Sequence, residues 1–135
     1  MPRPALPHPT PNELEVLKVL WERGPCTVRE VMQVLNRDRP RHYTSVMSLL
    51  NVMTYKGLLK RRPKGRAFEY QARSPREKTL GHMVQDVVQR AFEGSASTLV
   101  GRLLDSTNPS QEELERIRQL IVEHGEMKEE QDERT

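Results

Sequence analysis

The sequence predicts a mainly α-helical fold that contains one small β-hairpin. Apolar residues recur at three- and four-residue spacing in six segments of the chain. Capping motifs such as Thr10-Pro11-Asn12-Glu13 indicate where several of these helices begin. One stretch instead alternates apolar and polar residues after a Pro-Lys-Gly turn. The length of 135 residues allows one modest core, or two small packed units.

The first three predicted helices follow one another closely. The first is expected over residues 11–23, because a capping box starts it and Gly24-Pro25 ends it. The second is expected over residues 28–36, after a link so short that the two helices must form a tight angular pair. The third follows a basic loop and ends at Lys56-Gly57, with a core stripe of Val46, Leu49, Leu50 and Met53.

The outer face of the third helix favours contact with DNA. It presents Thr44, Ser45, Ser48 and Asn51, and no charged residue lies between Arg41 and Lys56. A solvated helix face normally carries Glu and Lys, so the absence of charge argues against simple exposure to water. Short polar side chains let a helix lie deep in a groove and reach base edges.

A β-hairpin with a basic tip is expected next. Its strands are residues 58–62 and 66–73, joined by a turn at Pro63-Lys64-Gly65. Phe68, Tyr70 and Ala72 alternate with polar residues, as in a half-buried strand. Three helices followed by a basic hairpin indicate a winged helix-turn-helix domain over residues 10–73, whose third helix enters the major groove.

The charge distribution supports a nucleic-acid partner. Residues 1–73 hold 14 Lys and Arg against six Asp and Glu, whereas residues 74–135 hold eight against 13. Residues 37–66 alone hold nine basic residues and one acid, and the alternative is a basic surface that only faces solvent. The candidate DNA-binding residues are Arg41, Tyr43, Thr44, Ser45, Ser48, Asn51, Lys60, Arg61, Arg62, Lys64 and Arg66.

Residues 74–125 are expected to form a helical dimerisation domain. Three amphipathic helices begin near Ser74, Ser95 and Ser110, and the last is expected to end at Gly125. They present more apolar surface than so small a unit can bury alone, which favours a symmetric dimer. Residues 1–9 and 126–135 are expected to be a disordered arm and a charged disordered tail. The candidate dimerisation residues are Leu80, Val84, Val87, Val88, Leu99, Leu103, Leu104, Leu114, Ile117 and Ile121.

Four short motifs follow one another in the chain: Thr10 to Trp21, Tyr43-Thr44-Ser45-Val46-Met47, Lys56-Gly57-Leu58-Leu59 and Gly65 to Tyr70. In this order they resemble the BlaI/MecI/CopY family of penicillinase-type repressors, and the likeness covers about residues 10–125. The resemblance implies a homodimeric winged-helix repressor of palindromic operators, controlling antibiotic-resistance or envelope-stress genes. It places Thr44, Ser45, Ser48 and Asn51 in the major groove and Arg62, Lys64 and Arg66 on the wing, with Lys60 and Arg61 as phosphate clamps.

Two features depart from the family pattern. Copper-responsive members carry Cys-x-Cys motifs near the C-terminus, and this chain has no cysteine after Cys26. In β-lactam-responsive members a membrane-bound metalloprotease system inactivates the repressor by cutting an Asn-Phe bond, which this chain lacks. The corresponding pair is Arg102-Leu103, the candidate cleavage region for such a sensor metalloprotease or another protease.

The remaining features indicate a cytoplasmic protein without a cofactor, a metal or an enzymatic site. Mean hydropathy is −0.76, and the longest apolar runs are too short for a membrane span. His8, His42, His82 and His124 lack ligand spacing. A buried structural thiol is the expected state of Cys26, the alternative being mild activation by the following helix start. Two other functions stay open: a ligand-sensing winged-helix regulator, and a winged-helix protein-interaction module.

Overall fold

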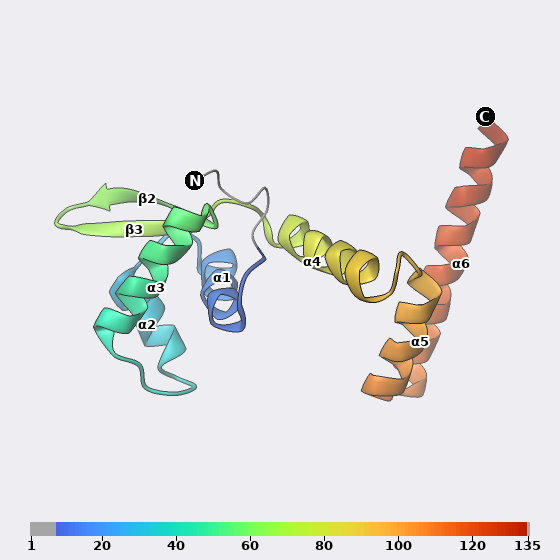
Figure 1. Ribbon diagram of the computed structural model, residues 1–135, viewed down its shortest axis with the longest axis horizontal. Coiled ribbons are helices and arrows are strands. Elements are labelled where there is room, and N and C mark those ends of the chain that lie inside the picture. The colour runs from blue at the N-terminus through green and yellow to red at the C-terminus, as the bar shows by residue number, and fades with distance from the viewer. Residues whose placement is uncertain (1–7, 135) are drawn as a thin grey trace. The chain divides into compact units, whose positions relative to one another are not determined.

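The computed structural model describes residues 8–134 and confirms the predicted fold class (Figure 1). The predicted arm of residues 1–9 lies mostly outside the described residues. Contacts divide the chain into two compact units that meet between Asp86 and Val87. The elements in chain order are α1 (Pro11–Arg23), β1 (Cys26–Thr27), α2 (Val28–Leu35), α3 (Tyr43–Lys56), β2 (Leu59–Lys64), β3 (Ala67–Ala72), α4 (Arg76–Ala91), α5 (Ala96–Thr107) and α6 (Gln111–Arg134).

Both predicted capping boxes form. The Thr10 hydroxyl accepts a hydrogen bond from the Glu13 backbone N–H, and the Glu13 carboxylate accepts one from the Thr10 N–H. Thr27 and Glu30 make the same reciprocal pair at the start of α2. Each box satisfies two N–H groups that a helix end leaves without partners, so α1 and α2 begin where the sequence predicts.

The small sheet has three antiparallel strands in the order β1-β3-β2. Strand β1 is not predicted by the sequence pattern, because a two-residue strand has no alternation of its own and exists only through its pairing with Glu69 and Tyr70. The predicted turn at residues 63–65 is also wrong. Strand β2 runs through Pro63 to Lys64, which pairs with Ala67, and Gly65 turns the chain at a φ of 62°. Proline is tolerated there because β2 is an edge strand.

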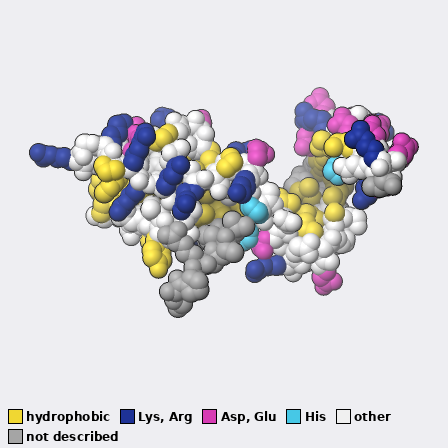
Figure 2. Space-filling model, turned by 90° about the horizontal axis from the view of Figure 1, so that it is seen from above, with side chains coloured by type: hydrophobic (Ala, Val, Ile, Leu, Met, Phe, Trp, Pro, Cys, Tyr) yellow, Lys and Arg dark blue, Asp and Glu magenta, His cyan; other side chains and the backbone are white. Residues whose placement is uncertain are grey.

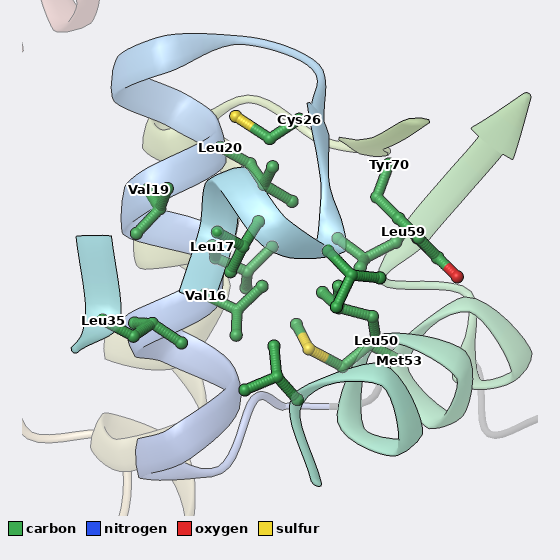
Figure 3. Close-up of a cluster of buried hydrophobic side chains, with 13 residues drawn as sticks. Val16, Leu17, Val19, Leu20, Cys26, Leu35, Leu50, Met53, Leu59 and Tyr70 are labelled. Atoms are coloured by element: carbon green, nitrogen blue, oxygen red, sulfur yellow. The ribbon is translucent and has the colours of Figure 1, made fainter. Parts of the chain in front are cut away.

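The core of the N-terminal unit joins all three helices to the sheet (Figure 3). Leu17 of α1, Val31 of α2 and Leu50 of α3 are at most 2% exposed. Leu59 and Tyr70 close the core from the hairpin, so the wing is anchored to the same cluster as the helices. This shared core fixes the position of α3 relative to the hairpin.

The buried Glu13 also holds α3 in place. Its carboxylate lies 2.9 Å from the Lys56 Nζ, which ties the start of α1 to the end of α3. Burial by itself raises the pKa of Glu13, but hydrogen bonds from Thr10 and Lys56 outweigh it, so the net pKa is lowered. The carboxylate is therefore ionised and paired in the folded protein.

Residues 76–86, the first two thirds of α4, belong to the N-terminal unit, so the division at residues 86–87 falls inside this helix. Trp21 Nε1 donates a 2.9 Å hydrogen bond to the Ser74 carbonyl just before α4. His8 Nε2 lies 3.4 Å from Asp86 Oδ2. These contacts extend the unit past residues 73–74, the boundary expected from the sequence.

The helix end expected at Gly125 is wrong, because α6 continues to Arg134. Gly125 does not adopt the positive φ that ends a helix, unlike Gly24, Gly57 and Gly94. The residues after it are mostly Glu, Lys, Gln and Arg, which have high helix propensity. Residues 126–134 are therefore helical, where a disordered tail was predicted.

No helix among residues 8–134 combines the length and apolar character that crossing a membrane requires.

Candidate nucleic-acid interface

The exposed side of α3 forms a ridge with a groove on each flank. Thr44, Ser45 and Ser48 are exposed and line a groove of about 730 Å³, bounded by the start of α1 and the loop after α2. Tyr43 and Asn51 line a second groove of about 430 Å³, bounded by the start of α2 and the hairpin. We call this second groove the wing groove. A helix that projects between two grooves has the shape needed to enter the major groove of DNA.

Basic side chains surround this ridge. Figure 2 shows Lys and Arg distributed across the N-terminal unit, with apolar patches between them. Within residues 37–66, which the structure describes completely, the only acid is Asp38. The surface therefore suits a polyanion.

Asn51 is held by two hydrogen bonds from the hairpin. Its Oδ1 accepts a 2.8 Å bond from the Tyr70 hydroxyl and a 3.1 Å bond from Arg61 Nη1. Because an arginine nitrogen can only donate, the oxygen end of this carboxamide is assigned without ambiguity. The Nδ2 group, with two N–H donors, is left to face an external acceptor.

The alternation of β2 divides the basic residues of the wing between two faces. Arg61 lies opposite Tyr70, on the face toward α3, and its guanidinium carbon is 4.2 Å from the centre of the Phe68 ring. Arg62 and Lys64 lie on the other face, where both contact Glu69. The face of β2 toward α3 therefore carries Arg61, and the opposite face carries Lys60 together with Arg62 and Lys64, of which the last two are paired with Glu69.

Glu69 is an unexpected buried acid at the centre of the second face. Its side chain is 8% exposed, and it contacts Arg62 at 2.8 Å and Lys64 at 3.1 Å. Hydrogen bonds from Arg62 and then Lys64 lower the pKa of Glu69, and the same contact raises the pKa of Lys64. The sequence pattern predicted that Phe68 and Tyr70 share a half-buried face, but Phe68 is 41% exposed and Glu69 is buried.

Arg41 lines the groove beside Thr44, Ser45 and Ser48, but its guanidinium is engaged by protein groups. Its guanidinium pairs with the Glu15 carboxylate at 2.7 Å and also donates to the Leu35 carbonyl, which fastens the loop before α3 to α1 and α2. Lys60 and Arg66 differ from Arg41, since both are exposed and neither forms an ion pair with any residue in the described range 8–134.

Two exposed residues at this surface were not among the candidates. Arg29, the second residue of α2, lies with its guanidinium carbon 6.0 Å from the centre of the Tyr43 ring and lines the wing groove. Tyr55, near the end of α3, is 74% exposed. A signal for Arg29 exists in the sequence: a cation in the first turn opposes the helix dipole, and so does not serve the helix itself.

Cys26 is a buried thiol, as expected. It is 3% exposed and donates to the Gly24 carbonyl at 3.4 Å. Burial, and then the charge of Glu30, raise the pKa of this thiol, so the start of α2 does not activate it. Among residues 8–134, no three His, Cys, Asp or Glu side chains cluster in a way that could hold a metal ion.

A sequence model of the penicillinase repressor family matches residues 9–123. The chain belongs to the penicillinase repressor family. It is similar to the penicillinase repressor of Bacillus licheniformis, with 25% identity over 125 residues that cover 93% of this chain and 98% of that protein. It is also similar to an uncharacterised 16.5 kDa protein of Latilactobacillus sakei, encoded in the ptsI 3′ region, with 25% identity over 113 residues, 84% of this chain and 77% of that protein. A solved structure, the DNA-binding domain of the repressor BlaI, aligns with 53% of this chain and 87% of its own at 27% identity and a TM-score of 0.48.

Membership in the penicillinase repressor family confirms the resemblance drawn from the four motifs. The family consists of DNA-binding transcriptional repressors rather than enzymes. The function class predicted from the sequence is therefore correct.

The predicted dimerisation residues of this repressor lie on α4, α5 and α6, and none of them is buried. Val84 is 56% exposed, Leu103 is 48% exposed and Ile121 is 60% exposed. The candidate cleavage pair, Arg102-Leu103, lies in the middle of α5 and is exposed.

Proposed function

We propose that this repressor acts as a homodimer on palindromic operators of antibiotic-resistance or envelope-stress genes, its own promoter region included. The observation that carries the proposal is that α4, α5 and α6 bury none of their residues within the chain. The N-terminal unit, in contrast, completes its own core. The apolar positions of the three helices therefore require another surface.

A second copy of the chain is the surface that fits best. Helices gain most of their stability in proteins from packing an apolar face, and α6 has 24 residues without a buried one. Its exposed apolar residues include Leu120 and Ile121, which are 64% and 60% exposed. A two-fold symmetric dimer covers identical patches with one another and presents two copies of α3 to DNA. Two symmetric reading helices select a palindrome.

On each half-site, the ridge of α3 reads the bases while the wing contacts the backbone. Thr44, Ser45, Ser48 and Asn51 supply short polar groups toward base edges, and Tyr43 flanks them. His42 gives no side-chain cap to α3, so first-turn N–H groups are available to a phosphate oxygen. Arg41 is left out of this contact set, because its guanidinium already has protein partners.

The repressor is released from DNA when the dimer is weakened. A monomer holds one half-site only and loses the gain in affinity that comes from simultaneous binding of two. Cleavage at Arg102-Leu103 by a membrane-bound sensor metalloprotease, or by another protease, would divide α5 and separate α4 from α6. Because this bond lies inside a helix, α5 must unwind locally before a protease can cut it.

Binding to two duplexes, measured beside the mass in solution, tests the proposal. The purified chain is titrated against its own upstream region and against a random duplex at several salt concentrations. We expect a dimer that prefers the upstream duplex by about 10³-fold or more, with a steep dependence on salt. Ser48→Ala should lose affinity for the upstream duplex only, while Lys60→Ala should lose affinity for both.

Matched controls are available on the same chain. Ser106 on α5 and Lys18 on α1 are exposed, and neither lines a groove beside α3. Ser106→Ala and Lys18→Ala should both bind as the wild type does. A monomeric mass on DNA would refute the dimer, and equal weak binding to both duplexes would favour a protein-interaction module instead.

A further inference from the structure

The wing groove concentrates positive charge next to aromatic rings. It is bounded by the start of α2, by α3 and by the hairpin, and Arg29, Arg61 and Arg66 all line it. Tyr43 and Phe68 are the rings beside these arginines. No acidic side chain contributes to its lining, all of which lies in the described part of the chain. Its chemistry therefore fits an anion with adjoining apolar surface, such as the sugar-phosphate backbone of DNA.

We propose that Arg29 and Arg61 form a stacked-arginine site for the DNA backbone, and that this pair, rather than Arg62 and Lys64, supplies the main salt-dependent part of the affinity. The proposal rests on the proposed function, because it assumes that α3 and the wing face DNA. It adds a residue from α2 to the interface and redistributes the contributions of the wing cations.

Aromatic rings restrict both arginines, by close stacking for Arg61 and at the outer limit of a cation–π contact for Arg29. The guanidinium carbon of Arg61 is 4.2 Å from the centre of the Phe68 ring, and that of Arg29 is 6.0 Å from the centre of the Tyr43 ring. A guanidinium held over a ring keeps N–H donors at its edge for an oxygen acceptor. Less side-chain freedom is then lost on binding, which favours affinity.

Arg62 and Lys64 are in the opposite situation. Arg62 donates to Glu69 Oε1 from both Nε and Nη2, at 3.0 and 2.8 Å, and Lys64 donates to Oε2 at 3.1 Å. The two cations therefore share one carboxylate, whose negative charge weakens their attraction for a phosphate even though each keeps N–H donors outside this contact. The side chain of Glu69 is 8% exposed, so its carboxylate stays beside Arg62 and Lys64.

The place of Arg29 in α2 supports a role in binding. It follows the capping residue Thr27 by two positions, where a positive charge faces the positive end of the helix dipole. The residues three and four positions further on, Met32 and Gln33, cannot form an ion pair with it. Helix stability gives no reason for a cation here. An anion bound at this end would interact favourably both with Arg29 and with the positive end of the helix dipole.

The salt dependence of binding distinguishes the two sets of cations. Full-length Arg29→Gln, Arg61→Gln, Arg62→Gln and Lys64→Gln variants are titrated with the upstream and the random duplex between about 50 and 200 mM salt. Each lost phosphate contact reduces the slope of log K against log salt by about 0.9, or about 1.8 for a dimer. We expect this reduction on both duplexes for Arg29→Gln and Arg61→Gln, and less than half of it for Arg62→Gln and Lys64→Gln.

A variant that should bind DNA more tightly provides a second test. Glu69→Gln removes the carboxylate charge that holds Arg62 and Lys64, so its slope should become steeper and its affinity for random duplex should rise. A wild-type slope in Arg29→Gln, or an equal reduction in all four arginine and lysine variants, would overturn the stacked-arginine site while leaving the proposed function intact. Wild-type protein that binds neither duplex would instead refute the proposed function.

Discussion

The hydroxyl of Tyr70 can be removed without changing the ring that closes the core. Tyr70 is 2% exposed, and its hydroxyl donates the 2.8 Å hydrogen bond that, together with Arg61, orients Asn51. A Tyr70→Phe substitution keeps the apolar ring in place and deletes one of these two restraints. The variant therefore tests whether the hairpin positions Asn51, a base-reading side chain of α3.

The structure sets the expected magnitudes. A hydrogen bond contributes about 0.5–1.5 kcal/mol net to the free energy of unfolding. Tyr70→Phe should lower the free energy of unfolding by about 1 kcal/mol, because Asn51 is exposed and no buried acceptor is left without a donor. A side chain that pairs well with a base discriminates by about 1–3 kcal/mol, so losing one restraint on it should reduce operator affinity roughly fivefold per half-site. Affinity for random duplex should not change.

A double-mutant cycle measures this coupling. Fluorescence anisotropy gives the ratio of operator to random affinity for Tyr70→Phe, for Asn51→Ala and for the double variant. If Tyr70 acts through Asn51, the double variant should discriminate no worse than Asn51→Ala alone. The reasoning is refuted if the double variant loses as much discrimination as the two single variants lose together. It is also refuted if Asn51→Ala loses discrimination while Tyr70→Phe keeps the wild-type ratio of operator to random affinity.

Three further predictions concern residues outside the DNA-binding surface. Because the folded pKa of Glu13 is lowered, its charge stabilises the protein above the unfolded pKa and this contribution is lost as pH falls through the folded pKa. Urea denaturation should show that Glu13→Gln costs about 1–3 kcal/mol near neutral pH and less near about pH 3, and equal losses at both pH values would contradict this. Ile121→Glu should halve the mass in light scattering without shifting the melting of the N-terminal unit, whereas a persistent dimer would exclude α6 from the interface. Gly125→Ala should stabilise α6 by about 1 kcal/mol and raise the helical circular dichroism, while destabilisation would mean that Gly125 ends the helix after all.

Local interactions explain what could be predicted from the sequence. The starts of α1 and α2 depend on side chains three residues away from the caps they serve, and the helical stripes depend on spacings of three and four. The order of helices and hairpin follows from these signals. It was enough to identify α3 as the candidate reading helix and to place the wing after it.

Long-range pairing explains what could not be predicted. Strand β1 exists because Cys26 pairs with Tyr70, far along the chain, and nothing in its own two residues indicates a strand. Glu69 is buried because β3 lies between two other strands, where Arg62 and Lys64 compensate its charge. The division of the wing into two faces depends on the register of β2 and β3, which a sequence pattern did not fix to within one residue.

The hydrogen bond between Trp21 and the Ser74 carbonyl gives the protein an optical reporter of its own. Trp21 is the single tryptophan of the sequence, and its indole N–H is fixed to the backbone just where the chain leaves the hairpin for α4. An indole that exchanges a carbonyl acceptor for water changes its emission, so the intrinsic fluorescence of the intact chain follows this one junction. A shift of that emission on adding DNA or a protease would show that binding or cleavage reaches the root of α4, without any label attached to the protein.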